Sequence, residues 1–368
     1  MKYYIIAGEK SGDLHASNLI KELKKLDKKA AFRGFGGELM QAAGLDLQVH
    51  YQKMAFMGFL EVIKHLPTIT KYLSLCKKDI VQWQPDAVIL VDYAGFNLRI
   101  AQFAKKKKFK TLYYISPKVW AWNTGRAKKI GKIIDKMFVI LHFEKAFYQQ
   151  FNYEVEYVGN PLFDEISNYE ADPEFVTRNH LSQRSMIAVL PGSRAQEVSN
   201  MLETMLSVAK DFQEHQWFVA GVTSLPSELY EPARALNIPV LYDQTYDLLQ
   251  NADAALVTSG TATLETALFE VPQVVCYKTS GFSYFIARLL IKVPFISLVN
   301  LLAEKEVVKE LIQNNFNEFN LKNELATVLT KKREAIKREY KELKEKIATE
   351  GTSLTTAKLM LKELKKKQ

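Results

Sequence analysis

The sequence predicts an α/β protein with two doubly wound parallel-sheet domains. Short apolar runs rich in β-branched and aromatic residues alternate with stretches of helical periodicity, which is typical of parallel sheets with right-handed crossovers. The run Ala87–Val91, AVILV, is continuously apolar, as expected for a central strand covered on both faces. The same alternation starts again after residue 163, and this predicts a second domain of the same class.

The first domain is predicted over residues 1–163, and its strands are Tyr3–Ala7, Ala87–Val91, Lys110–Ile115 and Lys136–Ile140. The second domain is predicted over residues 164–335, and its strands are Met186–Leu190, Trp217–Val222, Ala254–Val257 and Gln273–Tyr277. A glycine-containing turn and a helix over about residues 14–26 follow the first strand. Residues 160–183 are polar, contain two prolines and form a candidate linker.

The C-terminal segment 336–368 is rich in Lys and Glu. Apolar residues recur in it at helical spacing, at Ile336, Tyr340, Leu343 and Ile347. We expect a basic C-terminal helix that could pack back on the first domain. A solvated charged face is the simpler interpretation of most of its lysines.

The composition is that of a folded protein with about two domains, because 48% of its 368 residues are hydrophobic and 25% are charged. Cys76 and Cys276 are too few for a disulfide framework or a four-cysteine zinc site. His, Cys and Asp do not cluster at metal-ligand spacing, so we expect no metal and no cofactor. The longest apolar region, residues 281–303, is interrupted by Arg288, Lys292 and Pro294, so no membrane-spanning helix is predicted. The first apolar run is too short for a signal peptide, and we expect a cytoplasmic protein.

The formal net charge of +9 is unevenly distributed. Residues 1–163 carry 26 Lys and Arg against 14 Asp and Glu, residues 164–330 carry 11 against 21, and residues 331–368 carry 13 against 6. Such a basic block can indicate nucleic acid, a membrane surface or an anionic substrate. Because no nucleic-acid-binding module is recognisable, we expect no nucleic-acid partner.

One phosphate-binding candidate in the second domain is residues 190–194, LPGSR, at the end of a predicted strand. Gly192 allows a ligand to approach the backbone, Ser193 can bind phosphate, and Arg194 offers a fork suited to a diphosphate. The alternative is an ordinary strand–turn–helix in which Ser193 is the N-cap.

A second candidate is residues 259–265, SGTATLE, after the strand Ala254–Val257. Small hydroxyl residues and glycine at a helix start present O–H and N–H donors to an anion. Glu265 would lie one turn into that helix, where it could accept hydrogen bonds from a ribose. A capping box with Ser259 or Thr261 as the cap is the alternative, and both can hold together.

Three features of the first domain could carry function. Asp92 follows the strand Ala87–Val91 and is a candidate general base, with a loop-capping aspartate as the alternative. Residues 54–63 are unusually apolar and could meet acyl chains, although a buried helix is the more frequent explanation. The lysine run 105–108 could meet anionic headgroups, although such runs are usually a solvated helix face.

Taken together, ten motifs in order along the chain resemble the lipid-A-disaccharide synthase family. They are AGEKSGD (7–13), GFGGELM (34–40), MGFLEV (57–62), PDAVILVDYAGFN (85–97), YYISPKVWAW (113–122), FEKAFY (143–148), VGNPL (158–162), LPGSR with Glu197 (190–197), SGTATLE (259–265) and SLVNLLAEKEVVKELIQ (297–313). Each motif alone is weak, but ten in this order are highly specific.

The resemblance implies the two-domain GT-B glycosyltransferase architecture with a cleft between the domains. Members of that family join UDP-2,3-diacylglucosamine to 2,3-diacylglucosamine 1-phosphate without a metal. The reaction inverts the anomeric centre, forms a β-1,6-linked disaccharide 1-phosphate and releases UDP. The members are cytoplasmic and associate peripherally with the inner membrane of Gram-negative bacteria. A homodimer, with or without exchange of a C-terminal segment, is left open.

The resemblance also implies roles for individual residues. Asp92 would deprotonate the acceptor hydroxyl, and Arg194 would stabilise the charge on the leaving UDP. The residues implied to bind the nucleotide are Gly192, Ser193, Arg194, Glu197, Ser259, Gly260, Thr261, Thr263, Glu265 and Asn300. The residues implied to bind the acceptor are Gly8, Glu9, Ser11, Gly12, Asp13, Met57, Asn97, Ser116 and Trp120.

One departure from the family pattern concerns the loop after Ala87–Val91. Relatives commonly have a second aspartate there, in DxPDFN, where this chain has Gly95, so Asp92 is the sole carboxylate candidate in the loop. The alternative functions are another UDP-sugar GT-B enzyme, such as a cell-wall glucosaminyltransferase or an epimerase, and a membrane-bound nucleotide-sugar sensor.

Overall fold

The structure is a computed structural model that describes residues 1–54, 66–122, 124–181, 184–281, 284, 293–349 and 351–366, with only the backbone of Trp122. The chain forms two compact units. The first unit comprises Met1–Asp164 with Thr349–Gln368, and the second unit comprises Glu165–Ala348. The chain therefore passes from one unit to the other twice, after Asp164 and after Ala348.

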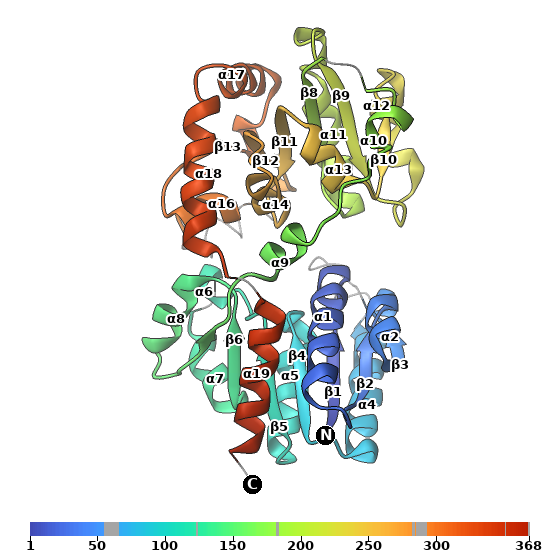
Figure 1. Cartoon of the computed structure of the whole chain (residues 1–368), viewed down its shortest axis with the longest axis vertical. Helices are drawn as coiled ribbons and strands as arrows, with labels where there is room; N and C mark the ends of the chain where they lie inside the picture. Colours follow the sequence, from blue (N-terminus) through green and yellow to red (C-terminus); the bar gives the residue numbers. More distant parts are fainter. Residues whose placement is uncertain are drawn as a thin grey trace. The chain divides into compact units, whose positions relative to one another are not determined.

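Among the described residues, the first unit contains a seven-stranded parallel sheet in the order β3-β2-β1-β4-β5-β6-β7 (Figure 1). Its strands are β1 (Lys2–Ala7), β2 (Ala31–Gly36), β3 (Leu45–His50), β4 (Ala87–Val91), β5 (Lys110–Tyr114), β6 (Lys136–Val139) and β7 (Glu156–Tyr157). Its helices are α1 (Lys10–Leu26), α2 (Glu38–Ala43), the 3-10 helix η1 (Tyr51–Lys53), α4 (Leu66–Trp83), α5 (Ala94–Lys106), α6 (Val119–Trp122), α7 (Arg126–Ile133), α8 (His142–Gln149) and α19 (Thr352–Lys365). Helix α9 (Pro161–Ser167) spans the first crossing between the units.

The sheet of the first unit is covered on both faces, as its alternating side chains require. Tyr4 and Ile6 of β1 join the core completed by α4, α5 and α7, whereas Tyr3 and Ile5 join the core completed by α1 and α19. Successive strand side chains point to opposite faces, so a strand buried on both sides must be apolar throughout. This explains why residues 3–7 and 87–91 are continuous apolar runs rather than alternating ones.

The second unit repeats this architecture with six parallel strands among its described residues, in the order β10-β9-β8-β11-β12-β13. Its strands are β8 (Met186–Leu190), β9 (Gln216–Gly221), β10 (Val240–Tyr242), β11 (Ala254–Thr258), β12 (Gln273–Tyr277) and β13 (Glu310–Ile312). Its helices are α10 (Phe175–Arg178), α11 (Ala195–Leu206), η2 (Ala209–Asp211), η3 (Ser227–Tyr230), α12 (Glu231–Ala235), α13 (Thr245–Asn251), α14 (Ala262–Leu268), α16 (Leu298–Ala303), η4 (Gln313–Asn315), α17 (Glu318–Leu329) and α18 (Arg333–Ile347). The predicted fold class, two doubly wound parallel-sheet domains, is confirmed.

The sequence pattern did not predict five of the strands, β2, β3, β7, β10 and β13. Strand β2 contains Arg33 and two glycines, and β7, β10 and β13 have only two or three residues each. Such segments lack the length and the apolar continuity that a strand prediction needs. Each of the five pairs in parallel with a neighbouring strand, which supplies its hydrogen-bonding partners.

The segment 336–368 forms two helices rather than the expected single one. Helix α18 buries Ile336, Tyr340, Leu343 and Ile347 within the second unit, whereas α19 packs beside α1 in the first unit (Figure 1). Gly351, with φ of 69°, separates them. Asp164 accepts the Gly351 N–H at 2.9 Å, and this carboxylate caps the start of α19.

Asp13 ties α1 to the loop that follows β2. Its Oδ1 accepts the N–H groups of Gly37 at 2.7 Å and of Met40 at 3.1 Å, and its Oδ2 accepts the N–H of Leu39 at 3.1 Å. Asp13 is only 2% exposed. The short helix α2 thus begins on a buried carboxylate from another helix.

We expect Asp13→Asn to lower the free energy of unfolding of the protein by about 2–4 kcal/mol. The amide would direct N–H donors at backbone N–H donors, which leaves buried groups unpaired. Urea unfolding followed by circular dichroism measures the change. The neighbouring exposed variant Ser11→Ala should change stability by less than about 0.5 kcal/mol, and an Asp13→Asn variant as stable as the wild type would contradict the capping role.

Candidate functional site

The predicted acceptor residues of the first unit gather at one edge of its sheet. Strand β4 pairs in parallel with both β1 and β5, so the loops after these three strands are neighbours at their carboxyl ends. These loops carry Gly8 and Glu9, Asp92, and Ser116, and the helices that follow them carry Ser11, Gly12, Asp13, Asn97 and Trp120. Met57, the remaining predicted acceptor residue, lies outside the described residues, as do most of residues 54–63 and the motif 57–62. Ligands of open α/β sheets bind at such an edge.

Asp92 lies in a strained turn at this edge. Asp92 and Tyr93 have φ values of 45° and 46°, in the left-handed region that bulky residues seldom adopt. Two buried donors hold the turn, because the Asp92 carbonyl accepts hydrogen bonds from Asn97 Nδ2 at 2.8 Å and from the Tyr113 hydroxyl. The strain is thus stabilised by the surrounding core, and the Asp92 side chain remains half-buried at the edge.

Gly8 is required by the same turn. A Cβ at Gly8 would lie 2.2 Å from the ring of Tyr93, so any side chain there would displace Tyr93. The Tyr93 hydroxyl donates to the Met54 carbonyl at 2.5 Å. Gly8 therefore lets the loop after β1 approach the loop after β4, which carries Tyr93. This explains its place in the motif without a direct ligand contact.

A buried carboxylate, Glu144, organises Ser116 and Trp120. Its Oε1 accepts hydrogen bonds from the Ser116 hydroxyl and from Trp120 Nε1, the latter at 3.1 Å, and its Oε2 accepts the Leu141 N–H at 3.0 Å. Glu144 is only 1% exposed, and burial raises its pKa to about 7. Glu144 lies in the motif FEKAFY, where the sequence did not indicate a role for it. Its position just after a predicted strand was the available signal.

In the second unit, the two predicted phosphate loops follow neighbouring strands, because β8 pairs in parallel with β11. Gly192 has φ of 116°, which favours glycine, and a Cβ there would lie 2.5 Å from Glu197 Oε2. Glu197 accepts the Ser193 N–H at 3.0 Å and pairs with Arg194 at 2.7 Å. Glu197 therefore shapes the loop, while the Arg194 side chain is 45% exposed.

Hydrogen bonds made by Ser259 and Thr263 hold the loop 259–261 in place. Ser259 Oγ donates to the Ile296 carbonyl at 3.0 Å. Thr263, which is fully buried, donates to the Gly260 carbonyl at 2.8 Å and accepts the Leu298 N–H at 3.2 Å. Thr261 is exposed at the start of α14. Thr263 thus supports the loop, and Thr261 is accessible to a ligand.

Glu265 is half-buried and has one partner that the sequence did not predict. Its Oε1 accepts a hydrogen bond from the Tyr246 hydroxyl at 3.2 Å. Burial, followed by repulsion from the Glu165 carboxylate, raises the pKa of Glu265 to about 7. A carboxyl group in this state can both accept and donate hydrogen bonds near neutral pH.

Asn300 is fully buried and its amide is occupied by the protein. Its Nδ2 donates to the Val308 carbonyl at 2.8 Å, and its Oδ1 accepts the N–H groups of Val307 at 2.9 Å and of Val308 at 3.0 Å. The Glu310 carboxylate accepts from Asn300 Nδ2 and from the Ser297 N–H, each at 3.0 Å. Asn300 and Glu310 thus shape the segment that supports Ser259. Glu310 lies in the motif 297–313, where the sequence did not indicate a role for it.

The described part of the chain contains no group of three or more His, Cys, Asp and Glu side chains placed to hold a metal ion. It also contains no helix long and apolar enough to cross a membrane.

Comparison with known proteins identifies the relatives of this chain. A family model described as Lipid-A-disaccharide synthetase matches residues 3–364. A lipid-A-disaccharide synthase of Geobacter metallireducens is 37% identical over 378 aligned residues, covering 99% of this chain and 97% of the relative. One of Syntrophus aciditrophicus is 38% identical over 373 residues, covering 98% and 97%.

Solved structures support the fold. The UDP-GlcNAc 2-epimerase of Methanocaldococcus jannaschii, solved in complex with UDP-GlcNAc and UDP, has a TM-score of 0.62 and 15% identity, covering 98% of this chain and 99% of that one. The glycotransferase of kitacinnamycin has a TM-score of 0.67 and 10% identity, covering 99% of each chain. At these identities the likeness concerns the fold alone, which is the one expected for GT-B proteins.

Glu144 should make the stability of the protein depend on pH. Its pKa of about 7 is above its ordinary value of 4.5, so the folded protein retains a proton that the unfolded chain loses. The stabilising contribution is full below about pH 4.5 and is lost as the pH rises through 7, by about 3 kcal/mol in total.

The variant Glu144→Gln cannot titrate, so the stability of the wild type relative to this variant should fall by about 3 kcal/mol between pH 4.5 and 8. Urea unfolding at several pH values measures this difference. Glu154→Gln removes the same charge at an exposed position of the first unit and serves as control. A difference between wild type and Glu144→Gln that does not change with pH would contradict the assignment.

Proposed function

The chain belongs to the lipid-A-disaccharide synthase family, and we propose that it is a glycosyltransferase that makes the lipid A disaccharide. In this proposal it transfers the diacylglucosamine unit of UDP-2,3-diacylglucosamine to 2,3-diacylglucosamine 1-phosphate. The products are a β-1,6-linked disaccharide 1-phosphate and UDP. The observation that carries the proposal is the family match over residues 3–364.

We propose that the second unit binds the UDP part of the donor. Two loops with N–H and hydroxyl donors follow the neighbouring strands β8 and β11, and the exposed Arg194 directly precedes α11 as its N-cap residue. A diphosphate can be held by such donors and by a guanidinium fork. Glu265 is suited to the ribose hydroxyls because its carboxyl group lies one turn into α14.

Asp92 is the proposed general base. Its carboxylate would take the proton from the 6-hydroxyl of the acceptor as that oxygen attacks C1 of the donor sugar. The bond between C1 and the UDP oxygen would break on the opposite face, which inverts the anomeric centre. Arg194 and the loop N–H groups would stabilise the negative charge on the departing UDP, so the proposal requires no metal or other cofactor.

We further propose that the acceptor and an anionic membrane surface meet the first unit. Residues 1–163 carry 26 basic against 14 acidic residues, and a phosphorylated lipid is an anionic amphiphile. The protein would then act in the cytoplasm as a peripheral protein of the inner membrane. The homodimer stays a prediction, which a measurement of the oligomeric state in solution would test.

The test is to mix the purified protein with both acylated sugars in detergent micelles and to measure disaccharide and UDP. Product that depends on both sugars supports the proposal. A UDP-sugar epimerase would instead convert the donor without the acceptor, and a nucleotide-sugar sensor would bind the donor without turnover. No disaccharide at high protein concentration would overturn the proposed function.

We expect Asp92→Asn to abolish turnover while UDP binding is retained, because a general base acts only in the chemical step. Single-turnover assays and calorimetric titration with UDP measure the two effects. The matched control is Asp86→Asn, just before β4 at its amino end, where the side chain accepts the Lys2 N–H at 2.7 Å. Near-normal kcat in Asp92→Asn would show that another group is the base.

Arg194→Ala should cost about 2–4 kcal/mol of transition-state stabilisation, a fall in kcat of roughly 30- to 1,000-fold. Arg234→Ala is the control, since Arg234 also forms an exposed ion pair three residues along a helix, with Glu231, but lies outside the two loops. A loss below about tenfold would argue against a role for Arg194 in leaving-group stabilisation.

A further inference from the structure

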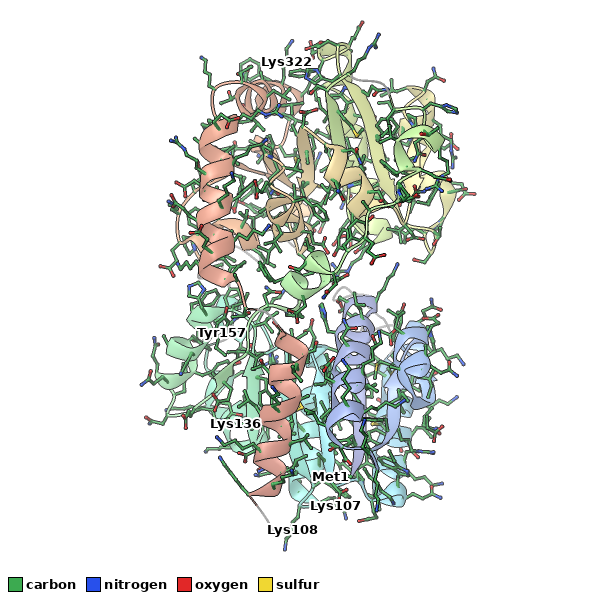
Figure 2. All side chains as sticks on the ribbon, in the orientation of Figure 1. Met1, Lys107, Lys108, Lys136, Tyr157 and Lys322 are labelled. Carbon is green, nitrogen blue, oxygen red and sulfur yellow. The ribbon has the colours of Figure 1, made fainter. Side chains whose placement is uncertain are left out.

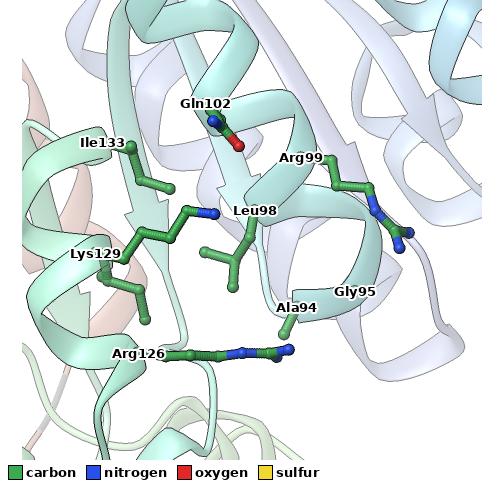
Figure 3. Close-up of a pocket in the computed structure, with 9 residues that line it drawn as sticks. Ala94, Gly95, Leu98, Arg99, Gln102, Arg126, Lys129 and Ile133 are labelled. Carbon is green, nitrogen blue, oxygen red and sulfur yellow. The ribbon is translucent and has the colours of Figure 1, made fainter.

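A cationic pocket with an apolar floor lies between α5 and α7 in the first unit. It encloses about 220 Å³. Leu98, Ile130 and Ile133 provide its apolar lining, which we call the floor. Arg126 and Lys129 extend their side chains across it from α7 (Figure 3). Arg99 lies at its rim. The residues that line it include no Asp or Glu.

The chemistry of this pocket favours an anionic amphiphile. Arg and Lys side chains bind a phosphate through charge-assisted hydrogen bonds, and the half-buried Leu98 and Ile133 offer a surface for a hydrocarbon chain. Pockets for whole drug-sized ligands measure about 300–1,000 Å³. The pocket is smaller, so it suits one end of a larger molecule, a phosphate with the first part of a neighbouring chain.

The pocket opens next to the proposed base. Ala94 and Gly95, which line it, follow Asp92 by two and three residues at the start of α5. Arg126 is the first residue of α7 and its side chain runs toward Ala94 (Figure 3). A Cβ at Gly95 would meet no atom within 4 Å, so the mouth is open at this point.

The lysine run that the sequence singled out lies at the opposite end of α5. Lys106 ends that helix, 12 residues after Ala94, which corresponds to roughly 20 Å along its axis. Lys107 and Lys108 lie at the same edge as Met1, where the strands begin (Figure 2). Residues 105–108 are thus remote from Asp92, whereas Arg126 and Lys129 line the pocket that begins two residues after it.

We propose that this pocket binds the phosphate of the acylated acceptor, with Arg126 and Lys129 as the phosphate ligands and the floor carrying the adjoining acyl chain. The inference rests on the proposed function and deepens it, because it assigns the acceptor phosphate a site beside Asp92. The donor diphosphate has its own proposed loops in the second unit. A pocket that recognises the acceptor phosphate would determine which of the two acylated sugars is bound as the acceptor.

The experiment compares two acceptors, the 1-phosphate and the same diacylglucosamine without phosphate, in neutral detergent micelles. In the double variant Arg126→Gln/Lys129→Gln, KM for the phosphorylated acceptor should rise on the order of ten- to a hundredfold, because two charged ligands are lost. We expect kcat, the KM for the donor and the KM for the acceptor without phosphate to stay within about twofold of wild type. Both residues are exposed, so the variant should fold.

The matched control is Lys107→Gln/Lys108→Gln, which removes two charges just beyond the far end of the same helix and should leave both KM values unchanged. An equal rise of KM for both acceptors would overturn the phosphate assignment. So would a loss that appears only on anionic vesicles and in both double variants, since the cations would then serve a membrane surface.

Failure of the pocket is distinguishable from failure of the proposed function. Binding of the phosphorylated acceptor to the protein is measured in micelles without donor by calorimetric titration. If the wild type makes no disaccharide but binds this lipid at least tenfold more tightly than the pocket variant, the phosphate assignment is supported and the proposed function is refuted. If the wild type makes disaccharide and both proteins bind the lipid equally, the pocket assignment falls alone.

Discussion

Buried and half-buried carboxylates that accept backbone N–H groups hold the carboxyl edges of both sheets in shape. Each strand of a parallel sheet is followed by a loop and a helix start whose N–H groups have no partner within the helix. Asp13 and Glu310 satisfy such groups from a different segment of the chain, whereas Glu144 caps the start of its own helix, α8, at the Leu141 N–H. A carboxylate offers two oxygens and no donor, so one side chain can pair with two or three N–H groups at once. Removing it leaves these N–H groups unpaired, and each buried donor without a partner costs free energy.

This arrangement divides the polar residues of each edge into two groups. Asn97, Thr263 and Asn300 are buried, and their hydrogen bonds are made to the protein itself. Their role is to fix a turn: Asn97 holds the Asp92 carbonyl, and Asn300 holds the segment beneath Ser259. The side chains left accessible belong to other positions, and Asp92, Thr261 and Arg194 are examples. A motif thus records both the groups that can meet a ligand and the groups that hold them in place.

The basic charge of the first unit likewise has two locations with different surroundings. Residues 105–108 lie at the amino edge of the sheet, where Lys105 pairs with Asp135 at 2.5 Å. Arg126 and Lys129 lie over an apolar floor next to the turn that carries Asp92. Net charge alone treats these lysines and arginines as equivalent. In our proposal, two properties distinguish Arg126 and Lys129 as ligands of the acceptor phosphate. They lie close to the turn that carries the proposed base, and apolar side chains of the pocket floor lie beside them.

The sequence by itself determined the fold class, most long strands and the family, and it predicted the loops proposed to bind ligands, because strand burial on both faces and strand–loop–helix order leave local patterns in composition. Only the tertiary structure decided which residues of those loops face the protein. It tied Ser116 and Trp120 to Glu144, buried Asn300, added the short strands β7, β10 and β13, and divided the C-terminal segment into α18 and α19. The physical reason is that each of these outcomes depends on a partner far away in the chain. Ser116 and Glu144 are 28 residues apart, and Asp164 and Gly351 are 187 residues apart, so no local sequence pattern predicts either contact.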